Sequence, residues 1–243
     1  MVSEIIKWHI ADISEDDNFK QSFYIHSLIL LTKFKLNLQK EYKTILDIPC
    51  GIGRHHTYLR NFGYEVYGAD ISEELIKLAK ERNKGFENFY FVGDMRNFKL
   101  NKKVDVILNW FTSFGYFDHE DNLKTVENFY ENLDNEGILI LEHGNFQIFD
   151  EKPIIHEYDK YIEITKISKF EDRLEFNNMF YRKEGENLIF EESIKVILRN
   201  YKFEEIVEII KKYFKIAFIF STLTFKEFDL NKDRRFVIVA IKS

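Results

Sequence analysis

Residues 44–54, which read Thr-Ile-Leu-Asp-Ile-Pro-Cys-Gly-Ile-Gly-Arg, constrain the fold more than any other part of the chain. A short apolar run ends in Asp47 and enters a Gly-x-Gly turn, after which we expect a helix with a polar face. A second apolar run, residues 66–69, ends in Asp70. Strand, glycine turn, helix, strand and acid, in this order, are typical of a βαβ unit that binds a nucleoside.

The charges around the turn favour one nucleoside cofactor. A dinucleotide-binding turn needs a third glycine, and His56 stands at that position. Helix N-termini attract anions such as a pyrophosphate, and the Asp47 carboxylate at the strand end would repel one. A cofactor with a sulfonium and an ammonium group is attracted instead, which favours S-adenosylmethionine over NAD. Asp70 is then placed to accept hydrogen bonds from the ribose hydroxyls. A βα unit without ligand would leave Gly51, Gly53 and both acids unexplained.

Size and composition indicate one α/β domain with an addition. The chain has 243 residues, 45% of them hydrophobic, which is enough for a substantial core. The formal net charge is -6 and no segment is strongly basic, so a nucleic acid partner is disfavoured. The lone Cys50 fits a reducing compartment and is expected to be a small packing residue. We find no secretory signal, and the longest apolar cluster, residues 28–31, is too short for a bilayer span; both indicate a cytoplasmic protein without membrane contact.

Strands alternate with helices through the first 140 residues, which predicts a doubly wound, mainly parallel sheet. We expect a helix over residues 18–40, with Phe23, Leu28, Leu31, Phe34 and Leu38 close to one face. The expected strands are residues 44–48, 64–69, 89–92, 104–109 and 138–141, and a helix that stops near Gly137 precedes the last of them.

The pattern changes after Pro153. Alternating apolar residues predict antiparallel strands at residues 161–170, 174–180 and 188–198, followed by a helix at 203–213 and strands at 215–220 and 235–241. We therefore divide the chain into an N-terminal helical cap (1–42), a cofactor-binding core (43–150), an antiparallel insertion (151–200) and a C-terminal part that completes the core sheet (201–243). The insertion is expected to cover the cofactor crevice or to form a homodimer interface.

The motifs in their order resemble those of class I S-adenosylmethionine-dependent methyltransferases. The resemblance is carried by residues 46–55, 68–72 and 93–96, and by the run Asn-Trp-Phe-Thr-Ser-Phe-Gly-Tyr-Phe at 109–117. It implies a seven-stranded Rossmann-like sheet whose last strand is antiparallel to the rest.

The resemblance also implies roles for particular residues. Asp47 would lie near the amino group of the cofactor, Asp70 would take the ribose hydroxyls, and Ile71 would flank the adenine. Asp94 and Met95 would hold the adenine edge. The complete expected cofactor set is Asp47, Pro49, Cys50, Gly51, Gly53, Asp70, Ile71, Asp94, Met95, Asn109 and Phe111.

The run at 109–117 is similar to a branch of small-molecule methyltransferases that includes the N-methyltransferases of nucleotide-linked amino sugars. In that branch the position of Tyr116 lies in the acceptor pocket, so Tyr116 is our first acceptor-side candidate. His143, just after a strand, is the second, because ligands of open α/β sheets sit at the carboxyl ends of strands. Trp110 and Phe111 replace the Pro-Pro-aromatic sequence of enzymes that methylate amide-like nitrogens, which puts such acceptors in doubt.

The sequence leaves several functions open. A methyl acceptor that is an amine needs only to arrive neutral, whereas a hydroxyl needs a base, so N- and O-methylation are both possible. A methyltransferase of protein or tRNA, a non-catalytic partner subunit with the same fold, and an NAD-linked oxidoreductase are the alternatives. With a single cysteine and with His55 and His56 diverging around a helix, we expect no metal site. Tyr24 and Trp8 are further candidates to close the pocket.

Overall fold

The computed structural model describes residues 14–149 and 152–242. Its core is a seven-stranded sheet with the order β10-β11-β5-β4-β1-β2-β3. The strands are β1 (Thr44–Asp47), β2 (Glu65–Asp70), β3 (Tyr90–Val92), β4 (Val104–Asn109), β5 (Leu133–Gly144), β10 (Lys215–Ser221) and β11 (Arg235–Ile241). Only β11 among them runs against the rest, since it is antiparallel to both β5 and β10. The predicted doubly wound sheet is confirmed.

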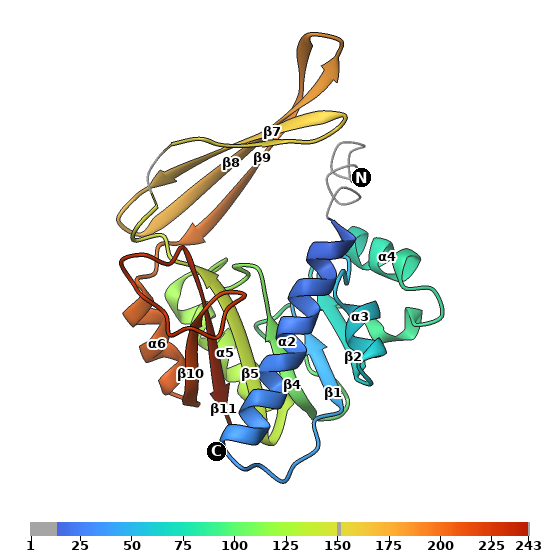
Figure 1. The fold of residues 1–243 in the computed structure, drawn as a ribbon, viewed down its shortest axis with the longest axis vertical. Helices are drawn as coiled ribbons and strands as arrows, with labels where there is room; N and C mark the ends of the chain where they lie inside the picture. The colour runs from blue at the N-terminus through green and yellow to red at the C-terminus, as the bar shows by residue number, and fades with distance from the viewer. Residues whose placement is uncertain (1–13, 150–151, 243) are drawn as a thin grey trace.

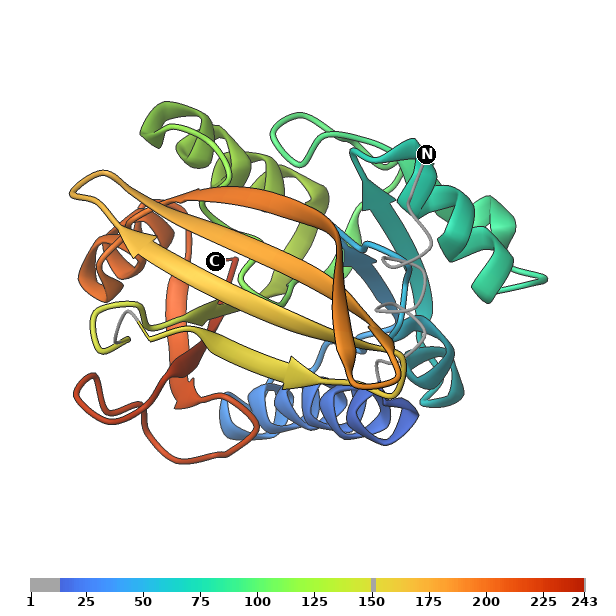
Figure 2. The same cartoon turned by 90° about the horizontal axis from the view of Figure 1, so that it is seen from above.

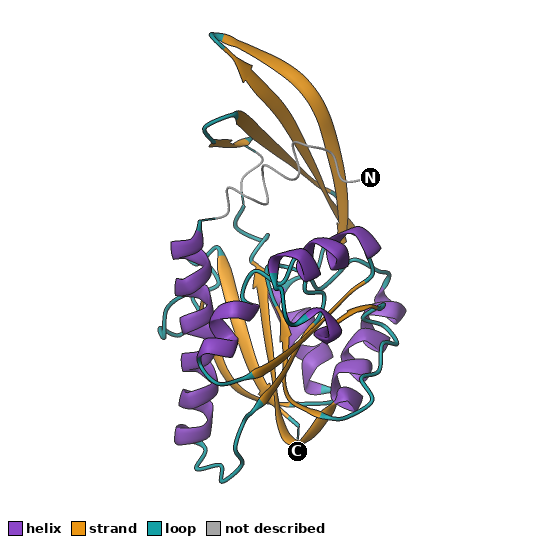
Figure 3. Cartoon of the chain, turned by 90° about the vertical axis from the view of Figure 1, so that its right-hand side faces the viewer, coloured by secondary structure: helices purple, strands orange, loops and turns teal. Residues whose placement is uncertain are grey.

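Helices cover both faces of this sheet (Figure 3). They are α2 (Glu15–Lys35), α3 (His56–Asn61), α4 (Glu73–Arg82), α5 (His119–Asn132) and α6 (Phe203–Lys211), with a 3-10 turn at Glu87–Phe89. Alternate residues along each strand point to opposite faces. Ile45 of β1 accordingly packs in the cluster that contains α2, and the next residue, Leu46, packs in the cluster that contains α5 and α6.

The first long helix is shorter than expected and buries a different face. Helix α2 ends at Lys35, five residues before the predicted end, and Asn37 follows with a left-handed φ of 51°. Its buried side carries Ile25, Leu28 and Ile29, with polar residues at its N-terminal end. Phe23 and Phe34 of the predicted apolar face are 53% and 80% exposed. The expectation based on apolar spacing is confirmed for Leu28 and wrong for Phe23 and Phe34, since the buried side of the helix also carries the polar residues Asn18 and Ser22.

A second sheet lies between β5 and α6 in the sequence. It is antiparallel, in the order β6 (Ile154–Glu157), β7 (Tyr161–Lys169), β8 (Arg173–Glu184) and β9 (Asn187–Arg199). Figure 1 shows it standing above one end of the core sheet, and Figure 2 shows its long strands crossing over the core. This end is the carboxyl end of the parallel strands, because Arg199 donates its backbone N–H to the carbonyl of Gly115, in the loop after β4, at 2.7 Å. The fourth strand, β6, was not predicted.

Candidate cofactor site

The turn after β1 requires its two glycines. Gly51 and Gly53 have φ values of 53° and 63°, a region that L-residues with side chains rarely adopt. A Cβ on Gly53 would lie 2.9 Å from the Tyr90 ring, so no larger residue fits there. A Cβ on Gly51 would meet nothing within 4 Å. The backbone of Gly51 therefore faces open space, as a ligand-contacting turn must.

His56 fills the place where a dinucleotide-binding turn has its third glycine. Its ring stacks on Tyr90, with 5.2 Å between the ring centroids and 14° between the planes. The two rings lie against Gly68 of β2, where a Cβ would come within 2.8 Å of His56 Cε1. In this chain the stacked rings of His56 and Tyr90 therefore pack directly against a glycine of β2.

Asp47 and His56 form a buried pair. His56 Nε2 lies 3.0 Å from Asp47 Oδ2, and the two residues are 0% and 3% exposed. Burial lowers the pKa of His56, so the neutral ring donates from Nε2 to the carboxylate. Burial also raises the pKa of Asp47, and the bond to His56 opposes this effect. The carboxyl group of this pair lines the cavity next to the glycine turn.

Asp70 ties the end of β2 to the glycine turn. Its carboxylate accepts the backbone N–H of Gly51 at 2.9 Å and that of Ser72 at 2.9 Å. Burial raises the pKa of Asp70, and these two hydrogen bonds act in the opposite direction. The neighbouring Ile71 is 62% exposed, so its side chain is available to a flat apolar ligand group.

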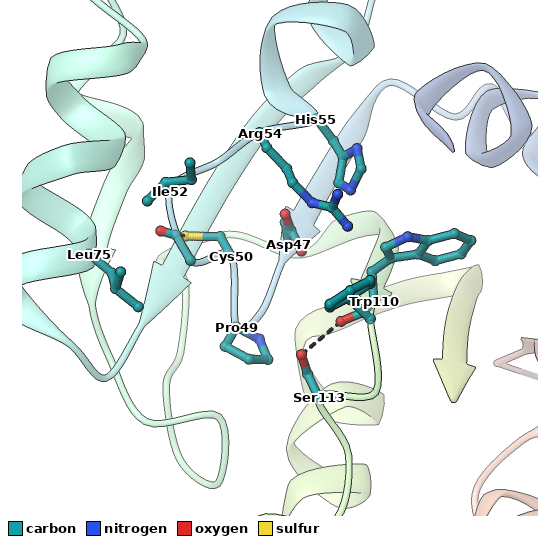
Figure 4. A pocket seen from close by; sticks show the side chains of 11 residues that line it. Asp47, Pro49, Cys50, Ile52, Arg54, His55, Leu75, Trp110 and Ser113 are labelled. Carbon is teal, nitrogen blue, oxygen red and sulfur yellow. Dashed lines mark hydrogen bonds between the residues drawn. The ribbon is translucent and has the colours of Figure 1, made fainter. Parts of the chain in front are cut away.

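A cavity of about 220 Å³ opens in front of the turn (Figure 4). Its lining comes from the β1 turn, from α4 and from the loop after β4: Asp47, Pro49, Cys50, Gly51, Ile52, Arg54, His55, Leu75, Trp110, Phe111 and Ser113. Five of the eleven residues expected to bind the cofactor, Asp47, Pro49, Cys50, Gly51 and Phe111, meet here. Gly53 lies underneath the turn, and Asp70 reaches the cavity wall through Gly51.

Arg54 is a cavity residue to which the sequence analysis gave no role. Its guanidinium donates to Asn18 Oδ1 at 3.3 Å and to Gln21 Oε1 at 3.0 Å, both on α2. Gln21 Oε1 also accepts the indole N–H of Trp110 at 2.9 Å. Asn18 and Gln21 lie more than 30 residues from Arg54 in the sequence. The position of Arg54 directly after Gly-x-Gly was therefore the only sequence signal for a place in the site.

Phe111 and Thr112 occupy a strained loop at the mouth of the cavity, with φ values of 62° and 59°. An ion pair between the partly exposed Arg235 and the buried Glu142 holds this loop, because Arg235 donates to both Glu142 and Thr112 Oγ1. The Phe111 ring lies 5.1 Å from the Arg235 guanidinium carbon and 4.9 Å from that of Arg54. Phe111 is 63% exposed, so its ring is accessible to a ligand. The two guanidinium contacts restrict the orientation of the ring.

The remaining predicted cofactor residues lie along the carboxyl ends of β3 and β4. Asn109 is fully buried and donates to the carbonyl of Ile48 at 2.8 Å, which ties β4 to β1. The Asp94 carboxylate accepts hydrogen bonds from Arg96, and this pairing lowers the pKa of Asp94. Met95 is buried, and its carbonyl accepts from Asn128 at 2.9 Å. None of the three lines the cavity.

The two acceptor-side candidates differ. Tyr116 is 46% exposed and lies within the electrostatic reach of Asp70. Desolvation by the surrounding protein and the charge of Asp70 raise the pKa of Tyr116, so its phenol is neutral at physiological pH. It can donate a hydrogen bond, and it is a poor base.

His143 does not face the crevice, and that expectation is wrong. It is 1% exposed, and its Nδ1 and Nε2 lie 2.7 Å and 3.2 Å from the carbonyls of Gly144 and Phe114. Burial lowers its pKa to about 4. The ring packs against Phe146 and beside Phe236, its cross-strand partner on β11.

Of the two residues suggested to close the pocket, Trp8 lies outside the described residues. Tyr24 is buried and donates its hydroxyl to the carbonyl of Thr224 at 2.5 Å. It contacts the Trp110 ring, at 6.4 Å between centroids, and so supports the cavity wall from behind.

Comparison with known proteins agrees with this geometry. Residues 45–137 match the family model described as "Methyltransferase domain". The chain is 31% identical over 104 residues to dTDP-3-amino-3,4,6-trideoxy-alpha-D-glucopyranose N,N-dimethyltransferase of Streptomyces venezuelae, covering 42% of this chain and 43% of that protein. It is 32% identical over 163 residues to glycine/sarcosine N-methyltransferase of Halorhodospira halochloris, covering 64% and 53%. The chain spans about half the length of these curated relatives.

Solved structures show the same fold over nearly the whole chain. Streptomyces venezuelae DesVI superposes with a TM-score of 0.79 at 16% identity, covering 100% of both chains. CalS10, an amino pentose methyltransferase from Micromonospora echinaspora solved with S-adenosylmethionine bound, gives 0.77 at 16% identity, covering 100% and 98%. The chain therefore has the Rossmann-like fold of these methyltransferase structures, and residues 45–137 are similar to the methyltransferase-domain model. The resemblance inferred from the motifs is confirmed. No helix in the described part of the chain is long and apolar enough to cross a membrane.

Proposed function

We propose that this chain transfers a methyl group from S-adenosylmethionine to a nitrogen of a small molecule. One observation carries the proposal: two carboxyl groups, Asp47 and Asp70, flank a glycine turn whose Gly51 faces open space. Carboxylates suit an ammonium group and ribose hydroxyls, and they repel the pyrophosphate of a dinucleotide. The open cradle at Gly51 and the acids on both sides fit the proposed cofactor.

The residues of this chain bind and orient the cofactor. Asp70 accepts hydrogen bonds from the ribose hydroxyls, and Ile71 covers the adenine. Pro49, Cys50 and the backbone of Gly51 and Gly53 enclose the methionine half. Asp94 and Met95 border the adenine edge. Phe111 closes the side next to the acceptor, and the buried Asn109 supports this side by tying β4 to β1. When bound, the cofactor supplies a methyl group on a positively charged sulfur.

Because that sulfur is a good leaving group, the protein acts mainly by positioning the reactants and excluding water. Correct orientation alone is worth roughly 7–11 kcal/mol of a bimolecular barrier. Tyr116 is proposed to donate a hydrogen bond to the acceptor, and its neutral phenol fits this role. An amine acceptor that arrives neutral needs no base.

The acceptor class is suggested by the relatives. Two of them are named for N-methylation of nucleotide-linked amino sugars, and others for N-methylation of glycine and sarcosine. We propose a small-molecule amine, such as an amino sugar or an amino acid, as the acceptor. It would bind between the carboxyl end of the core sheet and the sheet β6–β9. The chain would then have four parts: a cap (1–42), a cofactor-binding core (43–150), an acceptor cover with a possible homodimer contact (151–200), and a part that completes the core sheet (201–243).

Two further proposals concern the partners of the chain and its cellular location. The net charge of -6 argues against a nucleic acid partner. The lone, buried Cys50 fits a cytoplasmic, reducing location.

The proposal is tested by incubating the purified chain with methyl-labelled S-adenosylmethionine and a panel of amines, amino sugars, sarcosine, phenols, tRNA and protein. We expect label in a small amine, together with one equivalent of S-adenosylhomocysteine. Label confined to RNA or protein would contradict the small-molecule assignment. Cofactor binding without turnover on any acceptor would indicate the non-catalytic subunit instead.

A further inference from the structure

Helix α2 carries apolar side chains on two opposite sides. The buried side packs against the core sheet through Ile25, Leu28 and Ile29. The outer side carries a second apolar set, whose members are 45% to 80% exposed: Phe19, Phe23, Leu30 and Phe34. Both Figure 1 and Figure 2 show α2 on the outside of the core sheet, where this outer side is open to solvent. A helix that is apolar on both sides is normally covered on both sides.

The four outer side chains form one straight stripe, which we call the α2 stripe. Since each helical residue advances by about 100°, the four positions fall within about 60° of the helix circumference. The Phe19 and Phe23 rings both rest on Phe62, which follows α3, with ring centroids 6.3 Å and 6.1 Å apart. Their orientation is therefore set before any partner binds, which lowers the entropic cost of binding. A contiguous exposed apolar surface of this kind marks an interaction site.

The spacing of the α2 stripe is the same in both directions along the chain. Its intervals are 4, 7 and 4 residues. If two α2 helices pair antiparallel about a twofold axis, Phe19 of each copy lies opposite Phe34 of the other. In the same pair, Phe23 of each copy lies opposite Leu30 of the other. A surface that is complementary to itself in this way fits a second copy of the same chain.

The charges at the two ends of α2 favour the same arrangement. The first turn carries three acids and the last turn carries two lysines: Glu15, Asp16, Asp17, Lys33 and Lys35. Antiparallel pairing places the acidic turn of one copy beside the basic turn of the other, at both ends of the contact. Parallel pairing would instead bring acids next to acids and lysines next to lysines. Exposed charges contribute little affinity, so they set the direction of pairing while the apolar stripe supplies the binding.

We propose that the α2 stripe is a homodimer contact, in which α2 pairs antiparallel with α2 of a second copy of this chain. The contact goes beyond the proposed function and is separate from the one suggested for residues 151–200. Helix α2 has 21 residues and is therefore about 32 Å long. A contact along one helix of this length is smaller than a standard protein interface. We therefore expect a reversible dimer with a Kd in the micromolar range.

Sedimentation velocity of the purified chain, from low micromolar to several hundred micromolar, tests the dimer. We expect a monomer–dimer equilibrium that shifts toward the dimer with concentration. Leu30→Glu and Phe34→Glu each place a charge in the stripe at an exposed position, and each should weaken the dimer about tenfold or more. Ile155→Glu is the matched control, because Ile155 is 63% exposed on β6 of the second sheet, and it should dimerise as the wild type does. A wild-type chain that stays monomeric throughout would overturn the proposal, and so would a dimer that both stripe variants leave unchanged.

Disulfide cross-linking tests the antiparallel direction and remains decisive if a stripe variant does not fold. Cys50 is the lone cysteine of the chain and is buried, so an introduced thiol reports on the contact alone. The proposed twofold axis passes beside Ser27, so Ser27→Cys should form a disulfide-linked dimer with a copper oxidant. Phe34→Cys should not, because each Phe34 faces Phe19 of the other copy. A cross-linked dimer of Phe34→Cys, or none of Ser27→Cys, would contradict the antiparallel contact.

Discussion

Asp47 and His56 are joined by a 3.0 Å hydrogen bond at the base of the cavity, and both side chains are almost completely buried. The bond connects the end of β1 to the first residue of α3, across the glycine turn. It keeps a carboxylate in a place from which water is largely excluded. A positive ligand group gains more from such a charge than from an exposed one, since the local dielectric constant is lower.

Asp47→Asn should weaken S-adenosylhomocysteine binding by about 10- to 100-fold, because the ammonium group loses its charged partner. The raised pKa of Asp47 adds a pH dependence. Affinity depends on the ionised carboxylate, so it should be complete above this pKa and decline as the pH falls through it. Titration calorimetry should place the decline above the ordinary aspartate value of about 3.9. A decline that persists unchanged in Asp47→Asn would assign it to another group.

Asp70→Asn tests the ribose site. The variant should bind S-adenosylhomocysteine about tenfold or more weakly, because an uncharged amide is a poorer acceptor for two hydroxyls. The same loss is expected for 5′-methylthioadenosine, which shares the ribose but has no amino acid part. A loss restricted to S-adenosylhomocysteine would place Asp70 at the methionine half and contradict the assignment.

Tyr116→Phe tests the acceptor side. The variant should keep its affinity for S-adenosylhomocysteine and lose about tenfold or more in kcat/KM for the acceptor, which corresponds to one hydrogen bond. Because burial and Asp70 keep the phenol protonated, the activity should show no inflection from Tyr116 near neutral pH. Unchanged kcat/KM in the variant would exclude a contact with the acceptor.

His143→Gln tests a structural role. In the folded chain the pKa of His143 is about 4, below the usual 6.5. The neutral ring therefore contributes stability at pH values above about 6.5, and this contribution is lost as the pH falls from there to about 4. The lost free energy of unfolding is on the order of 3 kcal/mol. Denaturant unfolding at pH 7 and pH 4 should show a smaller pH effect in the variant, and an equal effect in both proteins would contradict the interpretation.

Gly68→Ala should destabilise the fold without adding charge or polarity. The new Cβ would lie 2.8 Å from both Cys50 Sγ and His56 Cε1, inside a packed region. Overpacking of this kind costs about 1–3 kcal/mol. Denaturant unfolding measures the loss. Gly51→Ala is the matched control: its Cβ meets no neighbour, so its cost comes from the left-handed backbone rather than from packing.

The core sheet could be predicted from the sequence because its strands are short apolar runs separated by polar, turn-forming or helical segments. The predicted strand at residues 104–109 agrees with the observed bounds, and so does that at 235–241. The orientation of α2 could not be predicted, since it depends on contacts of Asn18 and Gln21 with a loop that lies some 30 residues later in the sequence. Apolar spacing alone pointed to Phe23 and Phe34, which the fold leaves exposed.

The candidate site also has some residues that could be predicted from the sequence and others that could not. Asp47, Asp70, Gly51 and Gly53 were recognisable because strand ends and turns place them without knowledge of the packing. The partner of Asp47 was not recognisable, because the fit of His56 against Tyr90 and Gly68 depends on three elements coming together. His143 was misplaced for a related reason: its position after a strand suggested the crevice, and the pleat of β5 turned its side chain into the core.

The central claim is that the turn after β1 accepts a cationic adenosine thioether donor and excludes a dinucleotide. Calorimetric titration of the wild-type chain with S-adenosylmethionine and, separately, with NAD tests it most directly. We expect saturable binding of S-adenosylmethionine at one site per chain and no heat from NAD. Saturable binding of NAD without binding of S-adenosylmethionine would contradict the account.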